Sequence, residues 1–146
     1  SLNRDNSSNT NIYLIKDIIG NLFFHIINIY TVIMKEQITY DIFDKVDIRV
    51  GTVISVKQNE KARKPSLVIE VDFGKEIGVK QSSAQITHYY NEENLKGKQV
   101  IGVCNFPEKN IAGIVSQVLI LGSIDKEGKV ILVHPSQKSE NGLPIA

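Results

Sequence analysis

The residues best placed to do chemistry in this 146-residue chain are basic and small polar side chains. Within eight residues, four positive charges stand against one acid, and they come from Lys57, Lys61, Arg63 and Lys64. Lysine and arginine at this density neutralise phosphates, which supplies most of the affinity of proteins for nucleic acids. The alternative interpretation is an ordinary solvated loop, because charge alone does not distinguish the two.

A second polar run extends from Lys80 through Gln81, Ser82, Ser83 and Ala84 to Gln85. Ser82 followed three residues later by Gln85 has the form of a capping box, so a short helix is predicted to begin at Ser82. Small hydroxyls and the free N–H groups of a helix start can donate to phosphates and base edges. Capping without any ligand is the competing interpretation.

Patterns typical of catalysis are missing from the sequence. It contains no Gly-x-Ser-x-Gly elbow and no glycine-rich phosphate loop ending in Lys-Ser or Lys-Thr. Cys104 is the only cysteine, and His25, His88 and His134 fit no metal-ligand spacing, so we expect no disulfide, metal or cofactor. The net charge of +1 requires any nucleic-acid contact to come from a local patch. We predict a cytoplasmic binding protein, not an enzyme, with Cys104 buried as a small apolar side chain.

Short strands are the elements that must position these residues. From residue 48 to 57 the chain alternates at the period of a half-buried strand, with one face formed by Ile48, Val50, Thr52, Ile54 and Val56. Gly51 within this run predicts a bulge or a tight bend. The inward face of a second strand is predicted to be Leu67, Ile69, Val71 and Phe73. Further strands are predicted at residues 77–80, 100–106, 118–121 and 130–133.

This arrangement favours a mainly all-β OB fold, a five-stranded barrel with short flanking helices. A β-sandwich is the structural alternative. In an OB barrel the basic segment 57–64 would be the first long loop. Such barrels present their second and third strands and the adjoining loops to oligonucleotides.

Composition changes sharply at Met34, which predicts an extension at residues 1–33 and the barrel domain at residues 34–146. In the extension, apolar side chains recur at helical spacing at Ile15, Ile19, Leu22, Ile26, Tyr30 and Ile33. We predict an amphipathic helix docked on the domain or on a second copy. A membrane or targeting role and an upstream segment without function are the alternatives. Lys16 and Asp17 interrupt the apolar stretch, so we expect no stable membrane insertion.

Motifs across residues 41–146 resemble the EMAP-II-type tRNA-binding domain, and within it the CsaA subfamily. The segment FDKVDIRVGTV at residues 43–53 is similar to the opening motif of that domain. The run KQSSAQIT at residues 80–87 is highly specific for the subfamily. Shorter matches are DFG at 72–74, NFP at 105–107, IAG at 111–113 and NG at 141–142.

The resemblance implies an OB fold, a homodimer, tRNA binding and no catalysis. By position it implies a binding face formed by Arg49, Lys80, Gln81, Ser82, Ser83, Gln85, Asn105 and Ser116. The subfamily usually has basic residues where this chain has Asn110 and Val115, although Lys109 is retained. The two missing charges weaken the expectation of phosphate binding, but they do not affect the fold.

Two functions therefore remain open. The first is structure-selective tRNA binding, which the clustered basic loop favours. The second is a CsaA-type, export-associated chaperone that binds unfolded or precursor polypeptides. Its contact surface would be the apolar residues around Ile111, Ile114 and a dimer groove, and the apolar Val115 favours this alternative.

Overall fold

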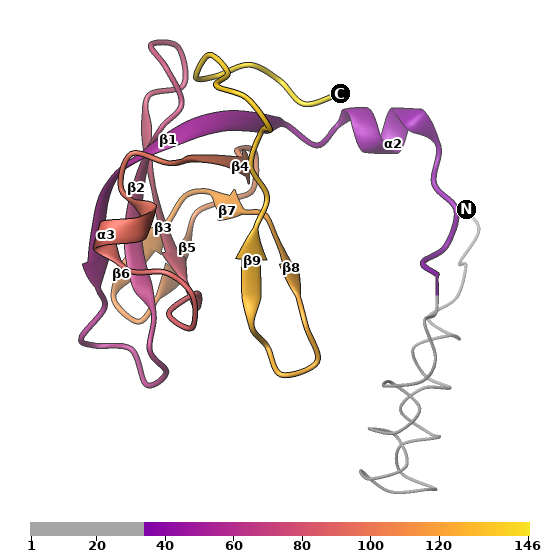
Figure 1. Ribbon diagram of the computed structural model, residues 1–146. Helices are drawn as coiled ribbons and strands as arrows, with labels where there is room; N and C mark the ends of the chain where they lie inside the picture. Colours follow the sequence, from indigo (N-terminus) through magenta and orange to yellow (C-terminus); the bar gives the residue numbers. More distant parts are fainter. Residues whose placement is uncertain (1–33) are drawn as a thin grey trace, which may run out of the picture. The chain divides into compact units, whose positions relative to one another are not determined.

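The computed structural model describes residues 34–146, and Figure 1 shows how their strands and helices are arranged. Residues Ile38–Ala146 form one compact unit. The amphipathic helix predicted before Met34 lies outside the described residues, so it stays a prediction, as does the boundary at Met34. Among the described helices, none has the length and apolar character needed to cross a membrane.

An antiparallel five-stranded sheet is the main element of the described chain (Figure 1). Its strands, in spatial order, are β3 (Val79–Ala84), β2 (Leu67–Asp72), β1 (Ile48–Gln58), β4 (Gln99–Val103) and β7 (Leu119–Ile120). Two hairpins follow along the chain, β5 (Lys109–Ile111) with β6 (Ile114–Ser116) and β8 (Gly122–Ile124) with β9 (Val130–Leu132). The sheet curves into a nearly closed barrel, which confirms the OB prediction.

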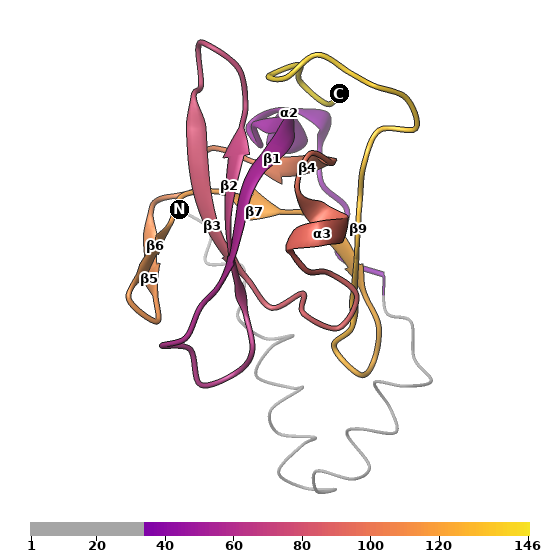
Figure 2. The same ribbon diagram turned by 60° about the vertical axis from the view of Figure 1, so that its left-hand side comes forward.

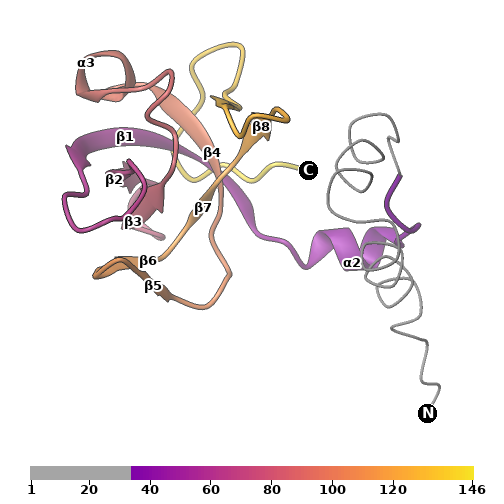
Figure 3. The same cartoon turned by 90° about the horizontal axis from the view of Figure 1, so that it is seen from below.

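Two short helices flank the barrel. Helix α3 (Glu92–Leu95) connects β3 to β4 and lies on the opposite side of the sheet from the β5–β6 hairpin (Figure 2). Its last residue, Leu95, is buried in the core. Helix α2 (Tyr40–Asp44) precedes β1 and extends away from the barrel, with no buried residue (Figure 3).

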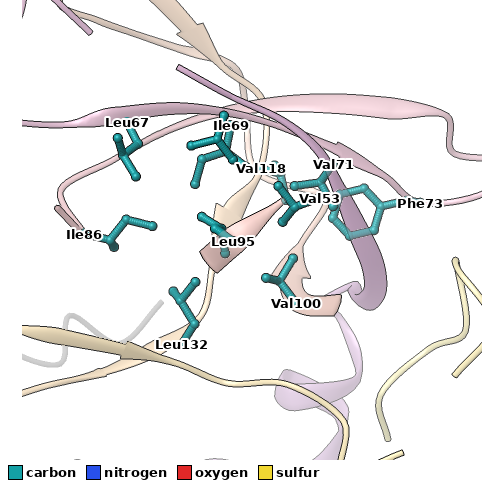
Figure 4. Packing of buried hydrophobic residues seen from close by; sticks show 11 residues of the cluster. Val53, Leu67, Ile69, Val71, Phe73, Ile86, Leu95, Val100, Val118 and Leu132 are labelled. Carbon is teal, nitrogen blue, oxygen red and sulfur yellow. The ribbon is translucent and has the colours of Figure 1, made fainter. Parts of the chain in front are cut away.

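The barrel interior is filled by aliphatic side chains from β1, β2 and β4 together with Phe73 (Figure 4). The predicted inward face of β2 is confirmed, because Leu67, Ile69, Val71 and Phe73 are all buried. The alternation of buried and less buried residues is regular along β2, because β2 pairs with β3 without a register shift. Side chains at every second position of a regular strand face the same side.

In β1 the predicted alternation is wrong from Gly51 to Ile54. Gly51 and Val53 are buried and Ile54 is exposed, whereas Val56, on the predicted face, is buried in the core. The register with β2 shifts between Val53 and Ser55, so one extra residue exchanges the two faces of the strand. The bulge predicted near Gly51 thus lies two residues beyond it. Gly51 itself allows close packing, because a Cβ there would be 2.5 Å from Val71 Cγ1.

The helix predicted to begin at Ser82 is also wrong. The strand predicted at residues 77–80 runs instead from Val79 to Ala84, so it includes Ser82, which pairs with Ile69 and is buried. A capping box stabilises a helix start only locally, whereas β3 gains a continuous ladder with β2. The reciprocal capping bonds occur instead at α3, between Asn91 and Asn94.

Cys104, predicted to be buried within a strand, follows the end of β4 and is only partly buried, with its side chain packed against the core. Burial raises the pKa of its thiol to about 11, and the nearby Asp47 carboxylate adds to the increase. The thiol is therefore protonated and unreactive at neutral pH.

A matched pair of glycine substitutions should separate backbone strain from steric overlap. Gly128 and Gly142 both have positive φ, 83° and 90°. A Cβ at Gly142 would be 2.5 Å from the Phe73 carbonyl oxygen, whereas Gly128 has no described atom within 4 Å of that position. Gly128→Ala should lower the free energy of unfolding by about 1 kcal/mol, because alanine is strained at a positive φ even where its Cβ meets no other atom. Gly142→Ala should cost about 1–3 kcal/mol more in urea titrations. Equal losses would contradict the steric argument.

The raised pKa of Cys104 predicts slow alkylation with a shifted pH profile. At pH 8 its thiolate fraction should be about 100-fold below that of an unperturbed thiol, because its pKa is raised to about 11. The rate of reaction with iodoacetamide should rise about tenfold per pH unit above pH 8 and level off only near pH 11. Levelling off near pH 9 would show that the thiol is unperturbed.

Candidate nucleic-acid interface

The basic loop connects β1 to β2 and is organised by a buried asparagine at its base. The N–H of Asn59 donates to the Ser66 carbonyl at 2.9 Å, and its side-chain Oδ1 accepts from the Lys61 N–H at 3.1 Å. Asn59 and Ser66 are buried, while the four basic side chains named for this segment are exposed. Lys57 is exposed near the end of β1, and Lys61, Arg63 and Lys64 are exposed on the loop that these bonds organise.

The tip of the β5–β6 hairpin lies against this loop. A Cβ added at Gly113 would be 3.6 Å from Lys61 Cδ, so the hairpin tip and the Lys61 side chain are close neighbours. The tip turns through Ala112 and Gly113, both with positive φ, and the Gly113 N–H donates to Asn110 Oδ1 at 3.1 Å. Lys109 is exposed at the first position of β5. We call Lys57, Lys61, Arg63, Lys64 and Lys109 the basic surface.

Strand β3 is joined to the same hairpin, mainly through polar side chains. The Gln117 N–H donates to the Gln81 carbonyl at 2.7 Å, and Gln117 Oε1 accepts from the Gln81 N–H at 3.0 Å. Gln81 Nε2 donates to the Val115 carbonyl at 3.1 Å, and Ser116 Oγ accepts from the Ser83 N–H at 3.3 Å. Gln81, Ser83 and Ser116, predicted as RNA ligands, thus also close the barrel.

The remaining predicted residues of β3 differ in accessibility. Ser82 is buried and faces the core, so its side chain is not available at the surface. Lys80 is half-buried, and Gln85, just beyond the end of the strand, is exposed. Gln81 is the residue of this run whose side chain takes part in the described barrel-closing bonds, whereas Ser83 contributes only its backbone N–H.

Arg49 and Asn105 hold the chain where it enters β1. Arg49 Nε pairs with Asp47 Oδ1, and its Nη1 donates to the Gly142 carbonyl at 3.0 Å. The hydrogen bond to Asp47 raises the pKa of the guanidinium, so Arg49 is always charged. The Asn105 side chain accepts from the Asp47 N–H and donates to the Lys45 carbonyl. Both side chains therefore have a structural function that the sequence did not reveal.

A separate groove of about 960 Å³ lies between α3, β4 and the C-terminal segment 134–141. The Gln99 side-chain amide fastens this segment by pairing with the Ser139 carbonyl at 2.6 Å and N–H at 2.8 Å. Its charged lining residues balance, since two cations and two anions come from Lys98, Lys138, Asp72 and Glu140. A neutral groove does not attract a polyanion, so the basic surface is the better candidate for RNA.

Gln117 and Glu108, whose side chains are bonded to each other beside the hairpin, are missing from the sequence-based set. Gln117 contacts β3 through both its backbone and its side chain, and its Nε2 donates to Glu108 Oε1 at 3.1 Å. Neither residue belongs to a charged cluster or to a recognisable motif. In residues 34–146, no group of three His, Cys, Asp or Glu side chains could hold a metal ion.

Comparison with known proteins agrees with this architecture. Residues 48–144 match the family described as "Putative tRNA binding domain". The structure of the chaperone CsaA from Bacillus anthracis is 43% identical with a TM-score of 0.72, covering 76% of this chain and 100% of that one. The structure of the CsaA chaperone protein from Picrophilus torridus is 45% identical with a TM-score of 0.70, and the match covers 75% of this chain and 100% of that one.

A longer relative contains this domain as a small part. The methionine–tRNA ligase of Chlorobium chlorochromatii is 39% identical over 111 residues, which are 76% of this chain but 15% of the ligase. The chain thus spans about 15% of the length of the curated relatives it matches. The resemblance noted in the sequence is confirmed: with its OB barrel and its match over residues 48–144, the chain belongs to the tRNA-binding domain family and is CsaA-like within it.

Proposed function

We propose that this chain binds tRNA without catalysing a reaction on it, and that the basic surface contacts the tRNA backbone. The observation that carries the proposal is that the tip of the β5–β6 hairpin lies close to Lys61, so the loop cations neighbour the hairpin whose first strand begins with Lys109. Membership of the tRNA-binding domain family supports tRNA as the ligand. A cytoplasmic location, where tRNA is available, is part of the proposal.

Recognition in this proposal depends on the shape of the tRNA backbone rather than on base sequence. Lysine and arginine contacts to phosphate position a protein without reading bases. Where related domains carry further cations, this chain has Asn110, whose Oδ1 is occupied by Gly113, and Val115, which is exposed. We therefore expect about three to five phosphate contacts and micromolar affinity.

We further propose that the protein acts as a homodimer joined through α2 and the C-terminal residues. Helix α2 has five residues and no side-chain N-cap bond, and a helix this short is unstable alone in water. It nevertheless exposes Tyr40 and Ile42, Ile38 just before it is exposed as well, and the nearby chain end exposes Leu143 and Ile145. A cleft of about 440 Å³ between α2 and the C-terminus is lined in part by Tyr40, Phe43 and Ile145. A second copy of this chain would cover these apolar side chains.

The second candidate function is binding of unfolded or precursor polypeptides. Two solved relatives are described as CsaA chaperones. The observation in this chain that favours it is apolar exposure near the β5–β6 hairpin, where Val115 is 40% and Phe106 is 55% exposed. Ile111 and Ile114 are half-buried partners across the hairpin and would contribute less contact area.

Removing three loop cations should weaken tRNA binding and its salt dependence. For the unchanged protein, the slope of log K against log salt should be roughly −2 to −4. The variant Lys61→Ala/Arg63→Ala/Lys64→Ala should lower affinity at least tenfold and flatten the slope by about 2, because each phosphate contact contributes about 0.7–0.9. Filter binding at several salt concentrations measures both quantities.

The matched control removes the same charge on the other side of the barrel, at Lys96, Lys98 and Lys138. Lys98 and Lys138 line the neutral groove, and Lys96 is the C-cap of α3. This triple alanine variant should keep most of the affinity and the full salt slope. If the two triple variants behave alike, the loop is not the binding site. Tighter binding of an unfolded polypeptide than of tRNA would favour the chaperone alternative.

Light scattering at micromolar concentration should give about twice the chain mass of 16.3 kDa. Ile42→Lys places a charge on the exposed face of α2 and should return the mass to that of a monomer, because burying an unpaired charge is costly. Val79→Lys is the control, since Val79 at 51% and Ile42 at 50% are equally exposed. A monomer before any substitution would contradict the dimer proposal.

A further inference from the structure

The base of the β5–β6 hairpin is closed by side chains where a backbone ladder would be expected. Between the β3 edge and residues 115–117, only the Gln117 N–H to Gln81 carbonyl bond joins two backbones. The other three bonds use the side chains of Gln81, Ser116 and Gln117. Strands β3 and β6 lie side by side, and these four bonds are the described hydrogen bonds that join β6 and Gln117 to β3.

Gln117 also connects the β3 edge to Glu108, the residue just before the β5–β6 hairpin. Its Oε1 accepts from the β3 backbone at Gln81, and its Nε2 donates to Glu108 Oε1 at 3.1 Å. Glu108 immediately precedes Lys109, and Lys109 pairs with Ser116, the neighbour of Gln117. One side-chain amide thus connects the barrel edge to both ends of the hairpin that carries Lys109.

We infer that Gln117 is a positioning residue for RNA binding, which acts through Glu108 to hold Lys109 in place at the base of the β5–β6 hairpin. This inference rests on the proposed function. Gln117 is half-buried, and both of its side-chain polar atoms are engaged by protein groups, so it is not placed to contact RNA itself. A cation held in one place loses less conformational entropy on binding than a mobile one.

Chemistry explains why a glutamine is suited to this position. The amide offers an acceptor and a donor on one planar group, so it can satisfy the Gln81 N–H and the Glu108 carboxylate together. The hydrogen bond to a charged acceptor is stronger than a neutral one. A glutamate at position 117 could accept from Gln81 but would face the Glu108 carboxylate with like charge.

A double-mutant cycle tests whether Gln117 acts through Lys109. We expect Lys109→Gln to weaken tRNA binding about 3- to 10-fold and Gln117→Ala about 2- to 5-fold. Because the second effect depends on Lys109, the double variant should bind no more weakly than Lys109→Gln alone. The control Gln137→Ala, in the groove on the far side of the barrel, should leave the affinity unchanged. Additive effects of the two substitutions would overturn the inference.

Exchanging the two partners provides a rescue that a loss of stability alone would not predict. Gln117→Glu should weaken binding by more than Gln117→Ala, because two carboxylates then meet. In Glu108→Gln/Gln117→Glu the new Gln donates to the new Glu, and the net charge equals that of the original protein. Affinity should return to within about twofold of the original. If the exchanged variant melts like the original protein but binds as weakly as Gln117→Glu, the inference is wrong.

Hydrogen exchange separates this inference from the proposed function. Gln117→Ala should speed exchange of the amides of residues 109–116 by at least fivefold, with no change in β1 and β2. This measurement needs no RNA. Unchanged exchange overturns the positioning role, whereas faster exchange in a protein that fails to bind tRNA overturns only the proposed function.

Discussion

Strand β1 is hydrogen-bonded along its length to three different segments. It pairs with β4 over its first half, with β2 over its second half, and at its start with the C-terminal segment through the Gly142 and Ile145 N–H groups. The bulge after Val53 allows one strand to satisfy these partners, because it changes direction and face without ending the ladder. The basic loop begins where β1 ends, so its position depends on this strand.

Polar side chains complete the barrel where backbone pairing ends. Gln81, Ser116 and Gln117 join β3 to the β5–β6 hairpin, and Gln99 fastens the C-terminal segment to β4. Such bonds are individually weak, but leaving a partly buried donor or acceptor unpaired is costly. The proposed RNA surface and the neutral groove on the other side of the sheet therefore both depend on side-chain amides.

Periodicity predicted most of the barrel but not its irregularities. The strict alternation from Leu67 to Phe73 was sufficient to identify the inward face of β2. In β1 the same rule failed from Gly51 to Ile54, because a bulge cannot be distinguished from a regular strand by alternation alone. The helix predicted at Ser82 failed for a related reason: its local capping signal competes with a strand ladder formed by residues far away in sequence.

The sequence by itself determined the OB fold, the family and the presence of a basic loop, because these follow from local alternation, charge and contiguous motifs. Only the tertiary structure decided what each polar side chain does. Arg49 is held by Asp47 and the Gly142 carbonyl, Ser82 faces the core, and Gln117 joins two edges of the barrel. Apart from the local Arg49–Asp47 pair, these arrangements join residues brought together by strand pairing or chain reversal, and a partner distant in sequence leaves no local pattern.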